Sequence, residues 1–233
     1  MRVAVFSDVH GNIYSFKNIL NSMKKNNIDH YIFCGDICGY YYHQNEIIEL
    51  FKGLKNFICV MGNHDKKIIN LLNKKETIIK KNIDKDRSSN SLLLKNITDA
   101  NKEYLQNLSI KYEGIIDNRK IGVFHGSPFN FLEEYVYPTD SLNNFEKLDY
   151  DIVFLGHTHY SMYKKLNNVI VVNPGSCGQP RNGRLPSYAI WETATNEVEF
   201  KYVDYDITKL VNDINMYDKF NKYLVDILYR GRY

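Results

Sequence analysis

Three short apolar runs in residues 1–75 are each followed by a polar loop and then by a segment whose apolar residues have helical spacing. The runs lie at 3–6, 31–34 and 57–61. This repeated order of strand, loop and helix predicts parallel strands with helices between them, and therefore an α/β fold. Because such sheets bind ligands at the carboxyl edge of their strands, we expect the three loops to form one site.

Polar side chains that can act as ligands follow each of these runs. Asp8 and His10 come after the first run, Asp36 after the second, and Asn63 with His64 after the third. Residues two apart in an extended segment point the same way, so Asp8 and His10 can offer an oxygen and a nitrogen to one metal ion. The competing interpretation is that Asp8 and Asn63 only cap the helices that follow them.

Two later apolar runs end in histidine. A hairpin with its second strand at 121–124 ends in His125, and a strand at 151–155 is followed by His157 and His159. The last two histidines stand at alternate positions, so they share one side of the chain.

Five of the seven histidines thus stand at or just beyond the end of an apolar strand. His30 and His43 lack this context, and we interpret them as ordinary surface residues. With Asp8, Asp36 and Asn63, the other five histidines give eight nitrogen and oxygen donors. That number is enough for two metal ions that share one carboxylate.

The second half of the chain reads mainly as short strands. Strands expected at 162–166, 169–172, 187–192 and 197–202 are predicted to form an antiparallel second sheet. A helix is expected near 141–148. The tail, 207–229, has apolar residues at helical spacing and is predicted to be one helix packed on the domain. No linker rich in Gly, Pro or Ser is present, so residues 1–233 are predicted to form one domain.

Residues 66–108 carry no readable motif. Basic residues outnumber acidic ones between 66 and 87. This run either forms a solvated helix face or attracts an anionic substrate to the neighbouring site. Residues 91–108 are expected to form one or two helices.

The overall charge argues against a nucleic-acid scaffold. Thirty Lys and Arg oppose 27 Asp and Glu, which leaves a net charge of +3, so we expect nucleic acid only as a substrate. Asp8 comes too early for a signal peptide, and no apolar run is long enough to span a bilayer. We therefore expect a soluble cytoplasmic protein with no membrane partner and four reduced cysteines. The sequence leaves its oligomeric state open.

Five motifs occur in a fixed order along the chain: Asp8-Val9-His10, Gly35-Asp36, Gly62-Asn63-His64-Asp65, His125-Gly126 and Gly156-His157-Thr158-His159. In these motifs and their order the chain resembles the calcineurin-like metallophosphoesterase superfamily. Residues 173–176 and 179–181 are similar to its compact bacterial and archaeal phosphodiesterase branch. The resemblance implies a four-layer α/β/β/α sandwich of two mixed sheets.

The resemblance also implies roles for individual residues. One metal ion would be held by Asp8, His10, Asp36 and His159, and the other by Asp36, Asn63, His125 and His157. Asp36 would bridge the two, and His64 matches the family's catalytic histidine, which protonates the leaving alkoxide. Two such cations, about 3.5–4 Å apart, acidify a bridging water for in-line attack on phosphorus. Mn²⁺ is the expected metal, and Fe, Zn, Co or Ni would also suit these donors.

The loop after Asp36 departs from one branch of the superfamily. Protein Ser/Thr phosphatases and symmetrical dinucleoside tetraphosphatases have an Asp-Arg-Gly block there, whereas this chain has Ile37-Cys38-Gly39-Tyr40. The phosphate-binding arginine of that block is therefore missing. We assign phosphate binding to Arg181 or Arg184, because a guanidinium offers two parallel donors to phosphate. The alternative is that both are surface arginines in a turn.

Three tyrosines follow the same loop. Tyr40, Tyr41 and Tyr42 are expected to form an aromatic wall on which a base stacks, with Tyr41 as the substrate-binding candidate. Since the chain has 19 tyrosines, a purely structural role is the alternative.

We therefore expect a dinuclear metal-dependent phosphodiesterase that acts on a nucleotide-type or small phosphodiester. The first alternative is a phosphomonoesterase or protein phosphatase that uses the same site. The second is a non-catalytic metal-binding scaffold for a partner protein. Relatives of that kind commonly lose the catalytic histidine or several ligands, whereas His64 and every ligand position are filled here.

Overall fold

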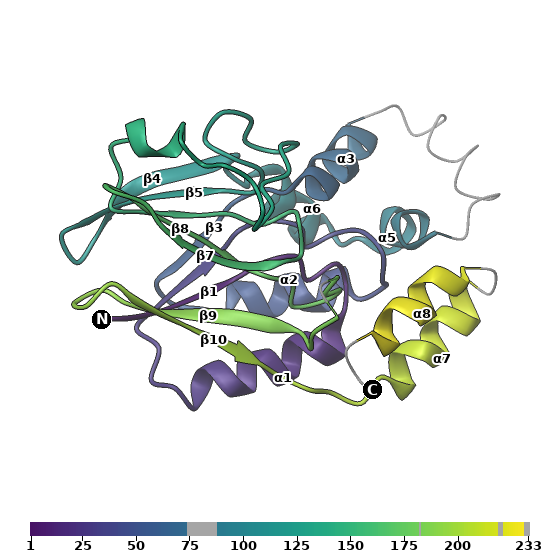
Figure 1. Ribbon diagram of the computed structural model, residues 1–233. Coiled ribbons are helices and arrows are strands. Elements are labelled where there is room, and N and C mark those ends of the chain that lie inside the picture. Colours follow the sequence, from purple (N-terminus) through teal and green to yellow (C-terminus); the bar gives the residue numbers. More distant parts are fainter. Residues whose placement is uncertain (74–87, 182, 219–220, 231–233) are drawn as a thin grey trace.

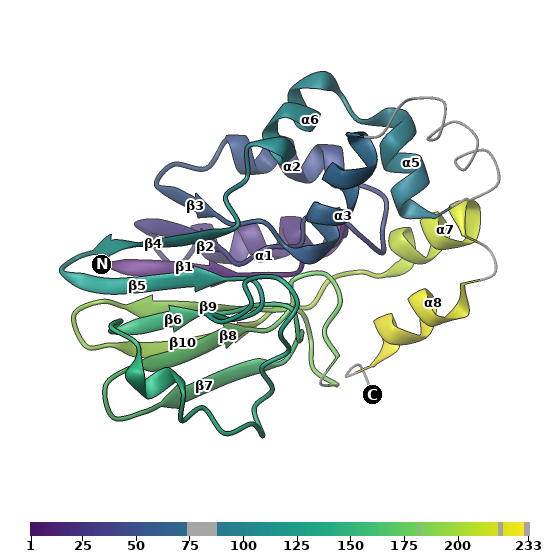
Figure 2. The ribbon, with the colours of Figure 1, turned by 90° about the horizontal axis from the view of Figure 1, so that it is seen from above.

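Two five-stranded sheets packed face to face form the centre of the protein (Figure 1, Figure 2). The computed structural model describes residues 1–73, 88–181, 183–218 and 221–230. The first sheet has the spatial order β10 (Glu197–Tyr202), β9 (Ser187–Glu192), β1 (Arg2–Phe6), β2 (His30–Phe33) and β3 (Phe57–Cys59). The second has the order β4 (Lys111–Ile116), β5 (Arg119–Phe124), β6 (Ile152–Phe154), β8 (Ile170–Pro174) and β7 (Ser161–Lys165).

Both sheets are mixed. In the first sheet β1, β2 and β3 are parallel, and β9 runs antiparallel to β1. In the second sheet β5, β6 and β8 are parallel, while β4 and β7 are antiparallel edge strands. The prediction of one antiparallel sheet after residue 160 is therefore wrong. Only β7 and β8 join the second sheet, and β9 with β10 extends the first.

Helices cover the outer face of the first sheet (Figure 2). They are α1 (Ile13–Lys24), α2 (Gln44–Lys52), α3 (Asn63–Leu72), α5 (Ser89–Asn96) and α6 (Asp99–Gln106). The last two confirm the helical prediction for residues 91–108. The basic run at 66–87 lies partly outside the described residues.

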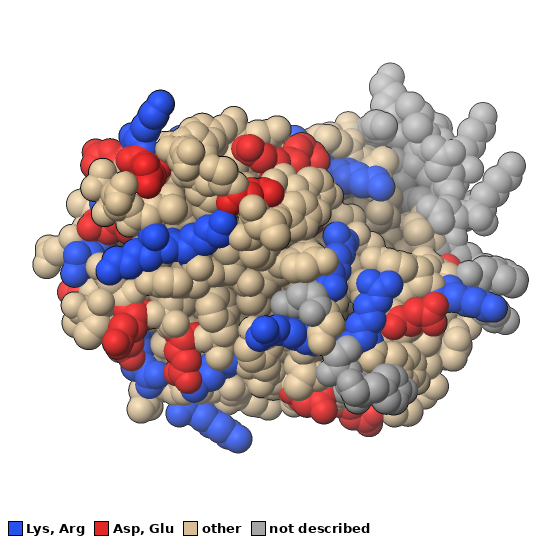
Figure 3. All heavy atoms as spheres, viewed as in Figure 1, with Lys and Arg blue, Asp and Glu red and all other residues tan. Residues whose placement is uncertain are grey.

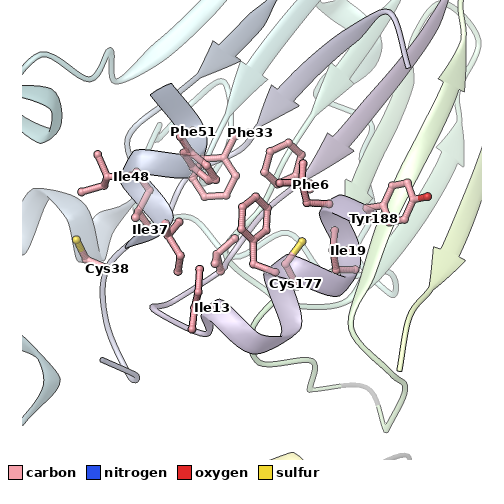
Figure 4. Close-up of a cluster of buried hydrophobic side chains, with 14 of the residues drawn as sticks. Phe6, Ile13, Ile19, Phe33, Ile37, Cys38, Ile48, Phe51, Cys177 and Tyr188 are labelled. Atoms are coloured by element: carbon pink, nitrogen blue, oxygen red, sulfur yellow. The ribbon is translucent and has the colours of Figure 1, made fainter. Parts of the chain in front are cut away.

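Aromatic side chains form the core between these helices and the first sheet (Figure 4). Phe6 and Phe33 from the strands contact Phe16 of α1 and Phe51 of α2, with ring centroids 4.8–5.8 Å apart. Burial of such a side chain contributes about 2 kcal/mol. This cluster fixes the positions of β1 and β2, whose carboxyl ends carry the first polar loops.

The outer face of the second sheet is covered by an irregular segment. The helix expected near 141–148 is wrong, since this region contains only the 3₁₀ helix Phe145–Lys147. Leu142 and Phe145 are buried three residues apart against the sheet, and that spacing suits a single 3₁₀ turn. The predicted α/β/β/α sandwich is confirmed, with a thin fourth layer.

The tail forms two helices, not one. They are α7 (Thr208–Tyr217) and α8 (Lys222–Tyr229), and α7 ends at Asp218, whose φ of −143° is not helical. Their apolar faces pack around Tyr41, which is fully buried between Leu210, Ile214 and Leu224. The tail therefore supports the loop that follows Asp36. None of the described helices has the length and apolar character needed to cross a membrane.

Candidate metal centre

The polar loops that follow five strands meet at one edge of the sandwich. The predicted ligands follow β1 (Asp8, His10), β2 (Asp36), β3 (Asn63), β5 (His125) and β6 (His157, His159). The aspartate and histidine ligand atoms form groups in which all atoms lie within 4.8 Å of one another, and Oδ1 of Asn63 lies 3.2 Å from Nε2 of His125. The structure therefore brings together every residue predicted to bind metal.

The first ligand cluster consists of Asp8, His10 and His159. Oδ1 of Asp8 lies 3.6 Å from Nε2 of His10 and 3.3 Å from Nε2 of His159. The two histidine Nε2 atoms are 3.0 Å apart. Asp8 Oδ1 is buried without a hydrogen-bond donor. A buried carboxylate oxygen facing two imidazole nitrogens fits a cation as the missing partner.

The second ligand cluster consists of Asp36, Asn63, His125 and His157. Nε2 of His125 lies 3.3 Å from Oδ2 of Asp36 and 3.2 Å from Oδ1 of Asn63. Nε2 of His157 is buried and has no hydrogen-bond partner, like the orphaned oxygen of the first cluster. Oδ2 of Asp36 is also 3.7 Å from Nε2 of His10, so one carboxylate links the two clusters.

Backbone carbonyls set the tautomer of three histidines. Nδ1 of His10 lies 2.7 Å from the carbonyl oxygen of Cys38, Nδ1 of His125 is 2.8 Å from that of Cys34, and Nδ1 of His159 is 2.6 Å from that of Gln179. A ring that donates from Nδ1 keeps its Nε2 lone pair free. This arrangement orients all three rings as metal ligands.

Charge coupling within the clusters shifts the pKa values of their acids and bases. Burial alone would raise the pKa of Asp8 and Asp36, but neighbouring histidines outweigh it and hold both pKa values well below the ordinary range. Burial would lower the pKa of His125, but Asp36 raises it to about 9. For His157, burial prevails and lowers the pKa to about 4. The carboxylates are therefore charged at neutral pH, as cation binding requires.

Five of the predicted ligands have a left-handed backbone. The φ angles of Asp8, His10, Asp36, His157 and His159 lie between +49° and +69°. Such angles cost non-glycine residues about 1–3 kcal/mol each and cluster at functional sites. The alternative that Asp8 only caps α1 is wrong, because Asn12 caps this helix by accepting from the Ser15 N–H at 3.1 Å.

His64 lies beside the clusters. Its ring centroid is 5.0 Å from that of His10 and 5.1 Å from that of Tyr40, and its backbone N–H donates to Asp36 Oδ1. Burial lowers its pKa to about 4. It also forms a third possible metal-binding group with His10 and Asp36, so proximity alone does not distinguish a ligand from an acid.

Asp65 supports the site, although no role was predicted for it from the sequence. Its fully buried carboxylate accepts from the backbone N–H groups of Asp36, Cys38 and Gly62 at 2.8–3.0 Å, and from that of Ile37 at 3.3 Å. It therefore joins the start of α3 to the loop that carries Asp36. Its place three residues after Gly62, at the third position of a helix, was the available signal.

The two candidate arginines differ in position. Arg181 donates from Nη2 to the Tyr40 hydroxyl at 2.8 Å, and its Nε is buried without a partner. Tyr40 in turn packs edge-on against His10, with ring centroids 4.6 Å apart. Arg184 instead donates to the Tyr202 hydroxyl at 3.0 Å, at the end of β10. Arg181 is therefore the arginine beside the site.

The stacking role expected for Tyr41 is wrong. This side chain is fully buried against the tail, so a substrate base cannot reach it. The backbone turns at Tyr40, which has a left-handed φ. Tyr40 therefore faces the site, whereas Tyr41 faces the core.

Comparison with known proteins agrees with this geometry. The model of the calcineurin-like phosphoesterase superfamily domain matches residues 1–196. The chain belongs to this superfamily. It is accordingly a metal-dependent phosphoesterase.

Several known proteins are similar to this chain over nearly their whole length. An uncharacterized protein of Methanocaldococcus jannaschii is 30% identical over 99% of this chain and 98% of its own. A phosphodiesterase of the same organism is 25% identical over 84% of this chain and 96% of its own. The crystal structure of a metallophosphoesterase from Sphaerobacter thermophilus superimposes with a TM-score of 0.81 and 29% identity, covering 99% of this chain and 100% of the other.

Proposed function

We propose that this phosphoesterase hydrolyses phosphodiesters at a centre that holds two divalent cations. The observation that carries the proposal is the link through Asp36, whose Oδ2 faces His10 of the first ligand cluster and His125 of the second. One cation would be held by Asp8, His10, Asp36 and His159, and the other by Asp36, Asn63, His125 and His157. The two orphaned buried atoms, on Asp8 and His157, support this division.

The donor set favours a metal that accepts both nitrogen and oxygen. Imidazole, carboxylate and amide ligands suit Mn²⁺, Fe, Zn, Co or Ni, and we propose Mn²⁺ for the assay. Bound cations stabilise the charge on a phosphoryl group and lower the pKa of the attacking water.

His64 supplies the proton for the leaving oxygen. Burial favours its neutral ring, and an anionic phosphodiester beside it would favour the protonated form that donates to the leaving oxygen. The partly buried Arg181 has an unpartnered Nε and holds a non-bridging phosphate oxygen. Tyr40 accepts from Arg181 and packs against His64, which fixes the distance between these two groups.

The substrate is a small phosphodiester or nucleotide, not a phosphoprotein. A relative with 25% identity is named as a phosphodiesterase, which supports a diester. The loop at 37–40 lacks the Asp-Arg-Gly block of the protein phosphatases, which argues against a phosphoprotein. On the face shown in Figure 3, basic and acidic side chains are interspersed, as expected for a small substrate rather than a long nucleic acid.

The test compares bis-p-nitrophenyl phosphate with p-nitrophenyl phosphate in the presence of Mn²⁺. We expect faster turnover of the diester, with loss of activity in Asp36→Asn and a smaller fall in His64→Ala, because p-nitrophenolate leaves without a proton. Asp149→Asn is the matched control, because the Asp149 side chain is 92% exposed and pairs with Lys120 of the β4–β5 hairpin, outside both ligand clusters. Preference for the monoester would make the protein a phosphomonoesterase. Two bound metal ions without turnover of either ester would make it a scaffold.

A further inference from the structure

Three tyrosines, two of them exposed, stand beside the second ligand cluster. The ring of Tyr135 lies over that of His157, with centroids 3.8 Å apart, and the ring of Tyr137 is parallel to that of Tyr135 at 5.9 Å. Tyr160 meets Tyr137 edge-on at 5.7 Å. We call these three residues the tyrosine platform. It begins at a predicted metal ligand and leads outward.

Tyr135 and Tyr137 remain accessible although the residue between them is buried. Val136 is 5% exposed, whereas Tyr135 and Tyr137 are 47% and 37% exposed. Alternating side chains point to opposite sides of an extended segment, so both tyrosines share the outward side. Parallel, accessible aromatic rings next to a site are the arrangement on which the bases of nucleic acids and nucleotides stack.

The segment that carries the platform is held in place. The Tyr137 N–H donates to Asp140 Oδ2 at 2.7 Å, and Lys164 Nζ donates to the Asp140 carbonyl oxygen at 2.7 Å. At its start, Ser127 donates to Glu134. Rings fixed in this way bind a flat ligand without a large ordering cost.

Arg181 lies near both ligand clusters. It is hydrogen-bonded to Tyr40, whose ring packs edge-on against His10, and it interacts electrostatically with Asp8 and Tyr135. A phosphate that contacts both Arg181 and the second ligand cluster would thus have its substituent next to Tyr135. The aromatic part of that substituent can then stack outward along the platform.

We propose that the tyrosine platform binds the nucleobase of a nucleoside phosphodiester whose phosphate lies at the metal centre. The inference rests on the proposed function and narrows its substrate class. A nucleobase fits better than an aliphatic group, because two parallel tyrosines offer π-faces and few hydrogen-bond partners of fixed direction. The platform also replaces the base-stacking surface that we expected at Tyr41.

The test compares two diesters that share the p-nitrophenolate leaving group: thymidine 5′-(p-nitrophenyl phosphate) and methyl p-nitrophenyl phosphate. We expect the wild type to prefer the thymidine ester. Tyr137→Ala should reduce the ratio of the two kcat/KM values roughly tenfold, mainly through KM, and Tyr137→Phe should preserve it. Tyr163→Ala is the matched control, since Tyr163 is 43% exposed on β7 and contacts no member of the platform among the ring pairs of the described residues.

Equal kcat/KM values for the two esters in every variant would overturn the platform while leaving the phosphodiesterase intact. If neither ester is cleaved, the proposed function fails, and a binding experiment still tests whether the platform binds a nucleobase. Saturation-transfer NMR of thymidine 5′-monophosphate should show the strongest transfer to the base protons in the wild type and its loss in Tyr137→Ala. Transfer to the sugar protons alone would overturn the inference.

Discussion

The two ligand clusters have similar donors but differ in how firmly their histidines are held. Both histidines of the first cluster, His10 and His159, have Nδ1 within 2.7 Å of a backbone carbonyl oxygen. In the second cluster His125 has such a partner, whereas His157 is held by the ring of Tyr135. Backbone partners orient a ligand more rigidly than a ring contact does. The first cluster is therefore the preorganised one, and the second, beside the tyrosine platform, is the more adaptable one.

This difference between the clusters predicts that two Mn²⁺ ions bind in steps of unequal affinity. Removal of the shared Asp36 carboxylate should abolish both steps. Asp36→Asn keeps the shape of the side chain but removes the charge between the clusters. We expect kcat on bis-p-nitrophenyl phosphate to fall by more than the roughly 10²–10⁴-fold that one general acid contributes. Metal content after gel filtration should fall with it. Full metal content in Asp36→Asn would contradict the sharing of this carboxylate.

Substitution of His64, which lies beside the clusters, tests whether this histidine is an acid or a metal ligand. We expect His64→Gln to lower kcat about 10²–10⁴-fold while the number of bound Mn²⁺ ions stays the same. A leaving group that needs no proton, such as p-nitrophenolate, should be affected less than a methyl or nucleoside alkoxide. Loss of one metal ion in His64→Gln would instead place His64 in the third group with His10 and Asp36.

Substitution of one histidine in each cluster tests directly whether the two clusters differ in metal affinity. His159→Ala should weaken the tighter of two Mn²⁺ binding steps, by at least the roughly 10–100-fold known for partners of metal ligands. His157→Ala should weaken only the looser step. Calorimetric titration of each variant separates the steps, and an identical pattern for the two variants would remove the proposed difference between the clusters.

The smallest expected effect comes from Asp65, which supports the loop of the bridging residue without facing the centre. Asp65→Asn places an amide NH₂ group against backbone N–H donors. We expect the free energy of unfolding to fall by about 2–3 kcal/mol, measured by urea denaturation. Asp99→Asn also removes an acid from the first turn of a helix, α6, and should cost only about 0.5 kcal/mol. Equal losses of unfolding free energy in the two variants would show that Asp65 contributes only as a charge at a helix N-terminus.

The sequence predicted the site better than it predicted the elements around it. Asp8, Asp36 and His125 were identifiable because each follows an apolar strand, and parallel strands bring their carboxyl ends together. The sheet to which β9 belongs depends on its pairing with β1, almost the whole chain away, and no local pattern encodes such a pairing. For the same reason the long-range partners of Asp65, which include Asp36, were visible only in the structure, although its position in the first turn of α3 indicated a capping role.

Apolar spacing was misread in two places. Leu142 and Phe145 have a spacing shared by α-helices and a single 3₁₀ turn, so the pattern did not distinguish them. In the tail, the apolar periodicity continued past Asp218, although the backbone leaves the helix there. Burial of Tyr41 and exposure of Tyr135 likewise depend on tertiary packing, since both tyrosines lie in loops without a periodic pattern.

Two cations, bound in unequal steps, should both be needed for diester hydrolysis. The most direct measurement is a titration of metal-depleted protein with Mn²⁺, in which heat and bis-p-nitrophenyl phosphate turnover are followed on the same samples. We predict two ions per chain, with activity that appears only as the second, weaker step fills. Full activity after one ion per chain, or binding of a single ion, would show that a second cation is not required.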